Sequence, residues 1–304
     1  MRLRSTRSSA ISASSGRSID AVIAGIFSSA TGLLLDAQIA SVRYQDNTGT
    51  TPASAAGNVV GLMLDQSKAL ATGSEIVANG LFGSTASWAM AGGSLIESGK
   101  LNFVTLSMQR PYNSGGTLAD CTKAHWFEID FEKETSNFGV SPALYSLAGV
   151  LLSASPAPPR IDSSGHYKIF VPANATSSNY FVGFNRSAAY TGTCSVDNTT
   201  LKEVAGNHST QATLSLKPKY QTGPQRIEFD LSDDALVVNF PVALGANCTV
   251  VYGAPGVGST VLTGQTIGTT YSITQSFTWI LISNRPLSAA ESSACVARAN
   301  QRSF

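Results

Sequence analysis

The sequence predicts a mostly β protein with two antiparallel β-sandwich (jelly-roll) domains, a short N-terminal helix and a C-terminal helix. The chain has 304 residues, enough for about two domains. Apolar residues make up 43% of it and charged residues only 13%, which argues against a disordered chain or a coiled coil. Short apolar runs alternate with stretches rich in Gly, Ser, Thr and Asn, as in strands joined by turns.

The first part of the chain, residues 1–35, is predicted to be an arm followed by an anchoring helix. Residues 1–17 are rich in Ser and Arg and have little to bury, so we expect them to be disordered or held by a partner. A helix is expected over residues 18–30, with Ser18 as its N-cap. Its apolar stripe either packs on its own domain or docks on another subunit during assembly; it consists of Ile19, Val22, Ile23, Ile26 and Phe27.

A separate module is predicted over residues 73–204, after residues 36–72, which form the first part of a flanking sandwich and a linker. The segment HWFEIDFEKE alternates strictly. Its alternation predicts a strand that points Phe127, Ile129 and Phe131 inward and Trp126, Glu128, Asp130 and Glu132 outward. A second strand is expected in LNFVTLSM, with Val104, Leu106 and Met108 on one face.

The last region, residues 205–304, is predicted to be a β-sandwich closed by one helix. Candidate strands such as RIEFDL, CTVVYGA and TWILIS are separated by turn residues. Ser288 and Glu291 have the spacing of a capping box. They predict a helix that runs to about Asn300.

The middle module resembles the carbohydrate-binding modules found with xylanases and cellulases, which are galactose-binding-like jelly rolls. The resemblance rests on its two ends: the segment from Glu75 to Phe82 followed by Trp88, and the segment from Asp197 to Val204. It implies that Trp88 lies in the core. It also implies a structural calcium ion, with Glu75 and Asp197 as oxygen ligands near the adjoining ends of the module.

The flanks resemble structural proteins of bacteriophage tails and virions that carry a concanavalin- or laminin-G-like sandwich. The matching segments are YQDNTGTTPASAAGNVVGLMLDQS, GNHSTQATLSLKPKY and the C-terminal ISNRPLSAAE. The motif parts 65–67 and 206–208 are separated here by the middle module, which indicates an insertion in a surface loop. The resemblance implies a location on the surface of a phage particle, other virion proteins as partners, and a homo-oligomer.

The sequence favours binding or scaffolding over catalysis. It contains no G-x-S-x-G and no H-E-x-x-H, and its three histidines, His125, His166 and His208, are far apart. Glu128 and Asp130 are expected roughly 6–7 Å apart on one strand face, a spacing that glycosidases use. We nevertheless interpret them as a solvated face. The four cysteines have no metal-binding spacing and are expected to be separate thiols, with one or two disulfides as the alternative.

A glycan-binding face is the main candidate site, because sugar receptors combine an aromatic ring with hydrogen-bonding groups. Trp126 is expected on the same face as Glu128 and Asp130; alternatively, it packs under a loop. The further candidates are Tyr112, Tyr145, Tyr167 and Arg110.

Three functions fit these features. The first is a virion component of a tail, collar, fibre or head decoration that touches polysaccharide on the host surface. The second is a purely architectural decoration or cement protein without a ligand. The third is a glycan-degrading enzyme with an accessory sugar-binding module. The formal net charge of +1 does not favour nucleic-acid binding, and no apolar run is long enough to predict a membrane span.

Overall fold

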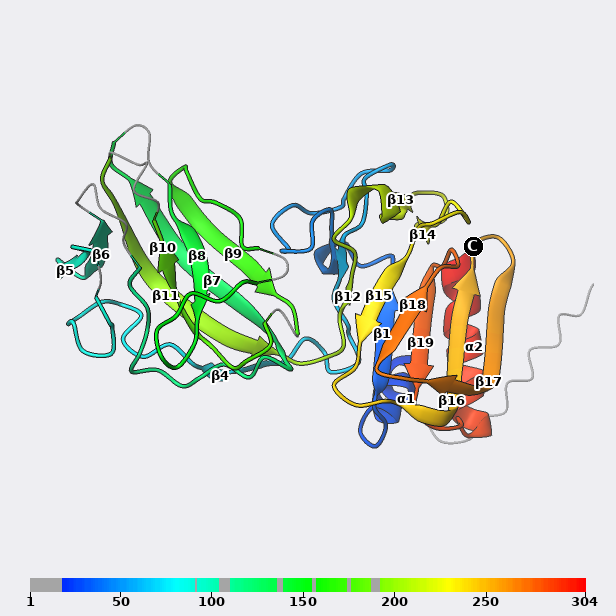
Figure 1. The fold of residues 1–304 in the computed structure, drawn as a ribbon. Helices are drawn as coiled ribbons and strands as arrows, with labels where there is room; N and C mark the ends of the chain where they lie inside the picture. The colour runs from blue at the N-terminus through cyan, green and yellow to red at the C-terminus, as the bar shows by residue number, and fades with distance from the viewer. Residues whose placement is uncertain are drawn as a thin grey trace, which may run out of the picture.

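The computed structural model describes residues 18–304, apart from residues 91, 104–109, 136–138, 155–156, 174–175 and 187–191. These residues form two β-sandwich lobes that are joined where the chain passes from one to the other and back (Figure 1). The mostly β fold with an N-terminal and a C-terminal helix is therefore confirmed. The strand face expected at Val104, Leu106 and Met108 lies outside the described residues.

The middle sandwich is antiparallel throughout the part that the structure describes. One of its sheets has the strand order β5-β6-β11-β7-β9, with β4 also paired to β11, and β8 pairs with β10 in the other. The core between them is drawn from residues 77–201. The strands are β4 (Thr72–Glu75), β5 (Leu95–Glu97), β6 (Lys100–Phe103), β7 (Ala124–Lys133), β8 (Ser141–Tyr145), β9 (Gly165–Val171), β10 (Phe181–Asn185) and β11 (Cys194–Val204).

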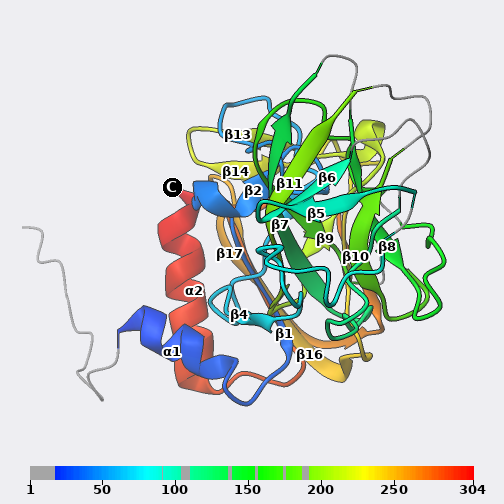
Figure 2. The ribbon, with the colours of Figure 1, turned by 90° about the vertical axis from the view of Figure 1, so that its left-hand side faces the viewer.

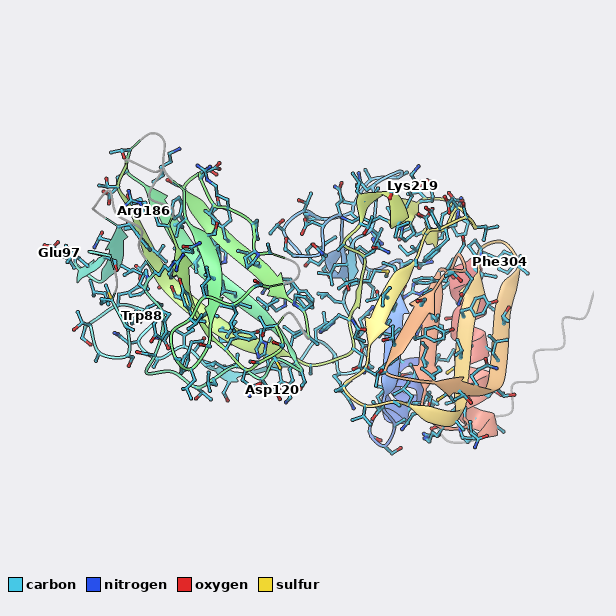
Figure 3. All side chains as sticks on the ribbon, in the orientation of Figure 1. Trp88, Glu97, Asp120, Arg186, Lys219 and Phe304 are labelled. Carbon is cyan, nitrogen blue, oxygen red and sulfur yellow. The ribbon has the colours of Figure 1, made fainter. Side chains whose placement is uncertain are left out.

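Strand β7 lies between β11 and β9 in its sheet, and its alternation points one face into the core. Phe127, Ile129 and Phe131 point into the core, as predicted from the sequence. Trp88 is also in this core, as expected, and Figure 3 shows it inside the lobe. Its ring lies 4.9 Å from that of Phe82, and its indole N–H donates to the carbonyl of Asn79, so the polar edge of the buried ring is satisfied.

The flanking sandwich is assembled from both sides of the insertion. Its sheets have the orders β1-β19-β16-β17 and β18-β15-β12-β3-β2, and β13 pairs with β14. Two 3-10 turns occupy Ala40–Val42 and Leu214–Leu216. The elements are α1 (Ile19–Ile26), β1 (Gly32–Asp36), β2 (Arg43–Tyr44), β3 (Leu62–Met63), β12 (Ser209–Thr210), β13 (Lys219–Gln221), β14 (Arg226–Glu228), β15 (Leu236–Asn239), β16 (Gly245–Ala254), β17 (Gly258–Ile267), β18 (Thr270–Ile273), β19 (Trp279–Ser283) and α2 (Ala289–Ser303).

A boundary at residue 35 does not separate an N-terminal part from this sandwich. Strand β1 pairs antiparallel with β19 along its whole length, from Gly32 opposite Ser283 to Asp36 opposite Trp279. Helix α1 belongs to the same lobe. The division at residue 35 expected from the sequence is therefore wrong, because the strand that follows the helix completes a sheet with the end of the chain.

The helices cover the outer side of the four-stranded sheet (Figure 2). Helix α2 begins with the predicted capping box: the Glu291 amide donates to the Ser288 hydroxyl, and the Ser288 amide donates to the Glu291 carboxylate. Arg285 also donates to Glu291 and is the main reason why the pKa of Glu291 is lowered to about 2. Among the described residues, no helix is long and apolar enough to cross a membrane.

The apolar stripe of α1 is used inside the chain. Ile23, Ile26 and Phe27 are buried against α2 and the sheet, with Ile19 and Val22 packed beside them. Asp20 forms an ion pair with Arg298 of α2. The interpretation of this stripe as a docking surface for another subunit is therefore wrong, because its own domain already covers it.

A buried carboxylate ties the two lobes together where the chain leaves and re-enters the flanking sandwich. Asp65 accepts hydrogen bonds from the backbone amides of Leu34, Ser67 and Asn207, at 2.7–2.8 Å, and from the hydroxyl of Ser67. Its own amide donates to Nδ1 of His208, 2.9 Å away. We call this group the Asp65 clasp; it holds strand β1 and both linkers at one point.

The clasp places one buried aromatic base and one close backbone contact beside the carboxylate. His208 donates through Nε2 to the carbonyl of Val204, and burial lowers the pKa of its imidazole to about 4, which keeps it neutral. Gly206 has a φ of +129°, and a Cβ atom there would lie 2.9 Å from a carboxylate oxygen of Asp65. The two parts of the split motif, residues 65–67 and 206–208, therefore meet in the clasp.

Replacement of Ile26 by Ala tests whether α1 is an integral part of the fold. Ile26 is fully buried, so we expect the variant to lose about 2–5 kcal/mol of unfolding free energy. Ala24→Ser, on the exposed side of the same helix, serves as the control and should change stability by less than about 0.5 kcal/mol. Chemical denaturation measures both, and equal stability of the two variants contradicts the packing described above.

Asp65→Asn tests the clasp through its pH dependence. Burial is the main cause that raises the pKa of Asp65 to about 6, so the folded state favours the protonated form. The stability that this preference contributes is present below the unfolded pKa of about 4 and is lost as the pH rises to about 6. The unfolding free energy of the natural protein relative to Asp65→Asn should fall over this interval, by up to about 3 kcal/mol.

Asp46→Asn provides a control of opposite sign. Burial raises the pKa of Asp46, but hydrogen bonds from Thr50, Thr48 and Thr51 together outweigh that effect and leave the pKa below its usual value. Stability that depends on this carboxylate is present above the unfolded pKa and is lost as the pH falls through the folded one. Slopes of the same sign for the two variants would contradict the assignment.

Candidate functional site

The outer face of the middle sandwich carries a network of charged side chains on β7, β9 and β11. Cross-strand pairing places Glu128 opposite Lys168 and Asp130 opposite His166. The Lys168 ammonium lies 2.6 Å from Glu128, and Nδ1 of His166 lies 2.8 Å from Asp130. Asn198 of β11 also donates to Asp130. We call this set, together with the ion pair Lys100–Glu132, the charged face.

Two carboxylates of the charged face are stabilised in their ionised form. Hydrogen bonds from Asn198 and His166 lower the pKa of Asp130, and Lys100 lowers that of Glu132. A glycosidase needs one acid with a raised pKa that can protonate the leaving group. The cavity beside Asp130 is only about 130 Å³. The expected proximity of Glu128 and Asp130 is thus present, but their partners stabilise the ionised form of Asp130.

Trp126 is not the exposed aromatic platform of this face. Its side chain is only 6% exposed and packs edge-on against Phe170 and Tyr44. The loop of residues 46–51 from the flanking sandwich covers it, and a Cβ atom on Gly49 would lie 2.7 Å from the ring. The exposed position expected from alternation is therefore wrong, and the alternative that Trp126 packs under a loop is correct.

The covering loop is held in place by its own hydrogen bonds. Asp46 accepts from the amides of Thr48, Thr50 and Thr51, which shapes the loop, and the carbonyl of Thr48 accepts from the amide of Phe170 at 2.6 Å. Around this contact, apolar side chains from both lobes form one small core between the middle and flanking sandwiches. It consists of Val42, Leu62, Leu64, Ala124, Trp126, Phe170 and Val204.

The tyrosines predicted as secondary candidates lie away from the charged face. Tyr145 is fully buried on the β8–β10 side, where its hydroxyl donates to the carbonyl of Phe184. Tyr112 stacks on it with ring centroids 5.1 Å apart. The expected exposure of Tyr145 is therefore wrong, because loop residues cover that sheet. Tyr167 is half-buried with its hydroxyl bonded to Ser163, and Arg110 is exposed in a loop.

The structure does not bring the expected calcium ligands together. One oxygen of Glu75 accepts from the amides of Ile76, Val77 and Leu201, whereas Asp197 pairs with Asp130 further along β11. Glu75 pairs with Lys202, which follows Asp197 by five positions along β11, roughly 16 Å at the usual rise per residue. The register along β11 thus gives no support for a calcium ion shared by Glu75 and Asp197, and that site stays a prediction. Within the described residues, Asp230, Asp233 and Asp234 form the one carboxylate group close enough to hold an ion.

The four cysteines are free thiols, so the expectation of separate thiols is confirmed. Three of them are buried, and burial raises the pKa of the Cys295 thiol to about 12. A raised pKa suppresses the thiolate that nucleophilic or redox chemistry needs. Cys194, Cys248 and Cys295 therefore act as small apolar side chains.

Sequence reasoning missed a cavity of about 480 Å³ at the junction of the lobes. None of the predicted site residues lines it. The only signal for it was the split of the motif at residues 65–67 and 206–208, since the two linkers that border the cavity begin there. Periodicity within either lobe could not reveal a space that exists between them.

Comparison with known proteins gave weak structural likenesses only. No family model matches the chain, and no curated protein matches it. An arabinose-bound α-L-arabinofuranosidase, MgGH51, aligns with a TM-score of 0.34 and 14% identity over 57% of this chain and 31% of the enzyme, so the chain spans less than a third of its length. The tandem CBM22-1–CBM22-2 domain of Xyn10C from Paenibacillus barcinonensis aligns with a TM-score of 0.29 and 9% identity over 80% of this chain and 96% of that domain. Both scores are too low to define a shared overall fold.

Trp126→Ala tests whether Trp126 is a buried packing residue between the lobes or an exposed ring that binds a ligand. Because the ring is buried on all sides, we expect a loss of about 3–5 kcal/mol in unfolding free energy, measured by denaturation. Leu147→Ala, at a side chain that is 73% exposed, is the control and should have little effect. A Trp126→Ala variant as stable as the control would indicate an accessible ring instead.

Proposed function

We propose that this chain is a structural, non-enzymatic component of a virus particle, in a tail, collar, fibre or head decoration, which presents its middle sandwich to the surroundings. The observation that carries the proposal is the Asp65 clasp. It fixes both linkers of an inserted domain to the scaffold at one buried carboxylate. An inserted domain held in this way keeps a defined direction, which a display role needs.

The arrangement of the lobes supports this role. Glu97 of the middle sandwich and Phe304 of the flanking sandwich lie at opposite ends of the molecule (Figure 3). The chain enters the described part through α1, on the flanking lobe. Residue 18, where the described part of the chain begins, therefore lies on the flanking lobe, and the far end of the middle sandwich points away from it.

The resemblance of the flanking segments to phage structural proteins agrees with the roles of the same residues here. The segment from Asp46 to Thr51 forms the loop over Trp126, and residues 65–67 and 206–208 form the clasp. A glycan-degrading enzyme is the weaker proposal, because the partners of Asp130 lower its pKa and the cavity beside it has a volume of only about 130 Å³.

The proposal is tested by tagging intact particles of the source virus. An epitope inserted after Ala148, in an exposed loop of the middle sandwich, should be accessible to antibody in immunoelectron microscopy, whereas the same epitope at Met1 should be shielded by neighbouring proteins. Mass spectrometry of purified particles should also detect the chain. Its absence from particles, or accessibility of the Met1 tag alone, would falsify the display role.

A further inference from the structure

The cavity at the junction is built by both lobes and both linkers. The ends of β7, β9 and β11 form one wall, through residues such as Lys123 and Glu203. The start of β1 and residues Asn239 and Pro241 of the flanking lobe contribute to the other. Ser67, Lys68 and Ala71 of one linker and residues 205–208 of the other complete the lining. Its volume of about 480 Å³ falls within the range of small-molecule sites in proteins.

The lining combines apolar surface with hydrogen-bonding groups. Accessible apolar surface comes mainly from Pro172, Pro241 and several alanines, whose short side chains leave the space open; Phe170 and Val204 also line the cavity but are only 1% and 2% exposed. Polar groups come from Thr122, Thr210, Asn207 and Asn239. The side-chain amide Nδ2 of Asn207 donates to the carbonyl of Gly32, 2.7 Å away, so its position is fixed. A ligand here must therefore have both apolar faces and hydroxyl-type groups.

The charges in the lining are largely matched within the protein. Lys123 and Glu203 form an ion pair at 2.9 Å, and the ammonium of Lys68 donates to the carbonyl of Phe27. A site for nucleotides or phosphates would instead gather several unpaired cations or backbone amides. The cavity thus fits an uncharged ligand better than a polyanion.

We propose that the junction cavity binds a neutral oligosaccharide. A sugar ring has C–H faces that pack on apolar side chains and hydroxyls that bond to Asn, Thr and the ends of an ion pair. This inference deepens the proposed function, on which it rests, by naming a ligand class and a place for contact with a host surface. The weak contacts of one copy would add up over many copies on a particle.

The test uses the full chain and a cavity-filling variant. Ala71 is exposed and lines the cavity, so Ala71→Trp fills the space without a change of charge. Ala148→Trp makes the same change in an exposed loop that does not line the cavity and is the matched control. On an array of bacterial-surface oligosaccharides, the natural chain and the control should bind the same neutral glycan within about twofold, and Ala71→Trp at least about tenfold more weakly.

Two further measurements keep the test independent of folding. Circular dichroism and denaturation should show that both Trp variants keep the natural fold. Binding of the oligosaccharide should lower the hydrogen-exchange rates of the backbone amides of residues 67–71 and 203–208 in the natural chain. It should not change these rates in Ala71→Trp. Protection confined to the β7–β9 charged face would overturn the cavity as the site.

The outcomes distinguish this inference from the function on which it rests. Equal glycan binding by Ala71→Trp, binding restricted to acidic glycans, or no glycan binding at all overturns the cavity proposal. None of these results bears on whether the chain is a component of the particle. The tagging experiment tests that question separately. Absence from particles together with glycan binding lost in Ala71→Trp would overturn the display role and leave the cavity as a sugar site.

Discussion

The buried carboxylate of Asp65 is the contact on which the arrangement of the two sandwiches depends. A carboxylate without water needs several donors, because each unsatisfied oxygen lone pair in the interior is costly. Here the donors come from β1, from the linker that leaves the scaffold and from the linker that returns. Any movement of one linker away from the other would remove a donor from a charge that has no access to solvent, so the clasp resists separation of the lobes.

The apolar cluster around Trp126 adds a second contact between the lobes to the polar Asp65 clasp. The loop from Asp46 to Thr51 is shaped by one carboxylate, and that shape brings Gly49 against the indole ring. The face of β7 that alternation predicts to be solvent-exposed is therefore divided in two. Its Trp126 end is covered by the scaffold, and its Glu128 and Asp130 end remains polar, with each acid paired to a base on β9.

The same fastening creates the cavity that neither sandwich contains by itself. Two convex lobes that touch at a seat and are joined by two short linkers leave a space beside the contact, and small residues such as Ala71 and Ala205 keep it open. A site of this kind has fixed walls only while the clasp holds. Rigidity for display and preorganisation for a ligand would therefore come from one structural feature.

The sequence by itself determined which residues are buried within each lobe and where several elements begin. Alternation identified β7 and the inward positions of Phe127, Ile129 and Phe131, and the capping box located the start of α2, because both depend on local geometry of the backbone. The outer surface of each element was decided only by tertiary structure. Trp126 and the α1 stripe are covered by other parts of the chain, Glu75 and Asp197 lie on different strands, β4 and β11, and the cavity lies between the lobes. Periodicity reports the side to which a residue points, whereas what lies against that side depends on residues distant in the chain.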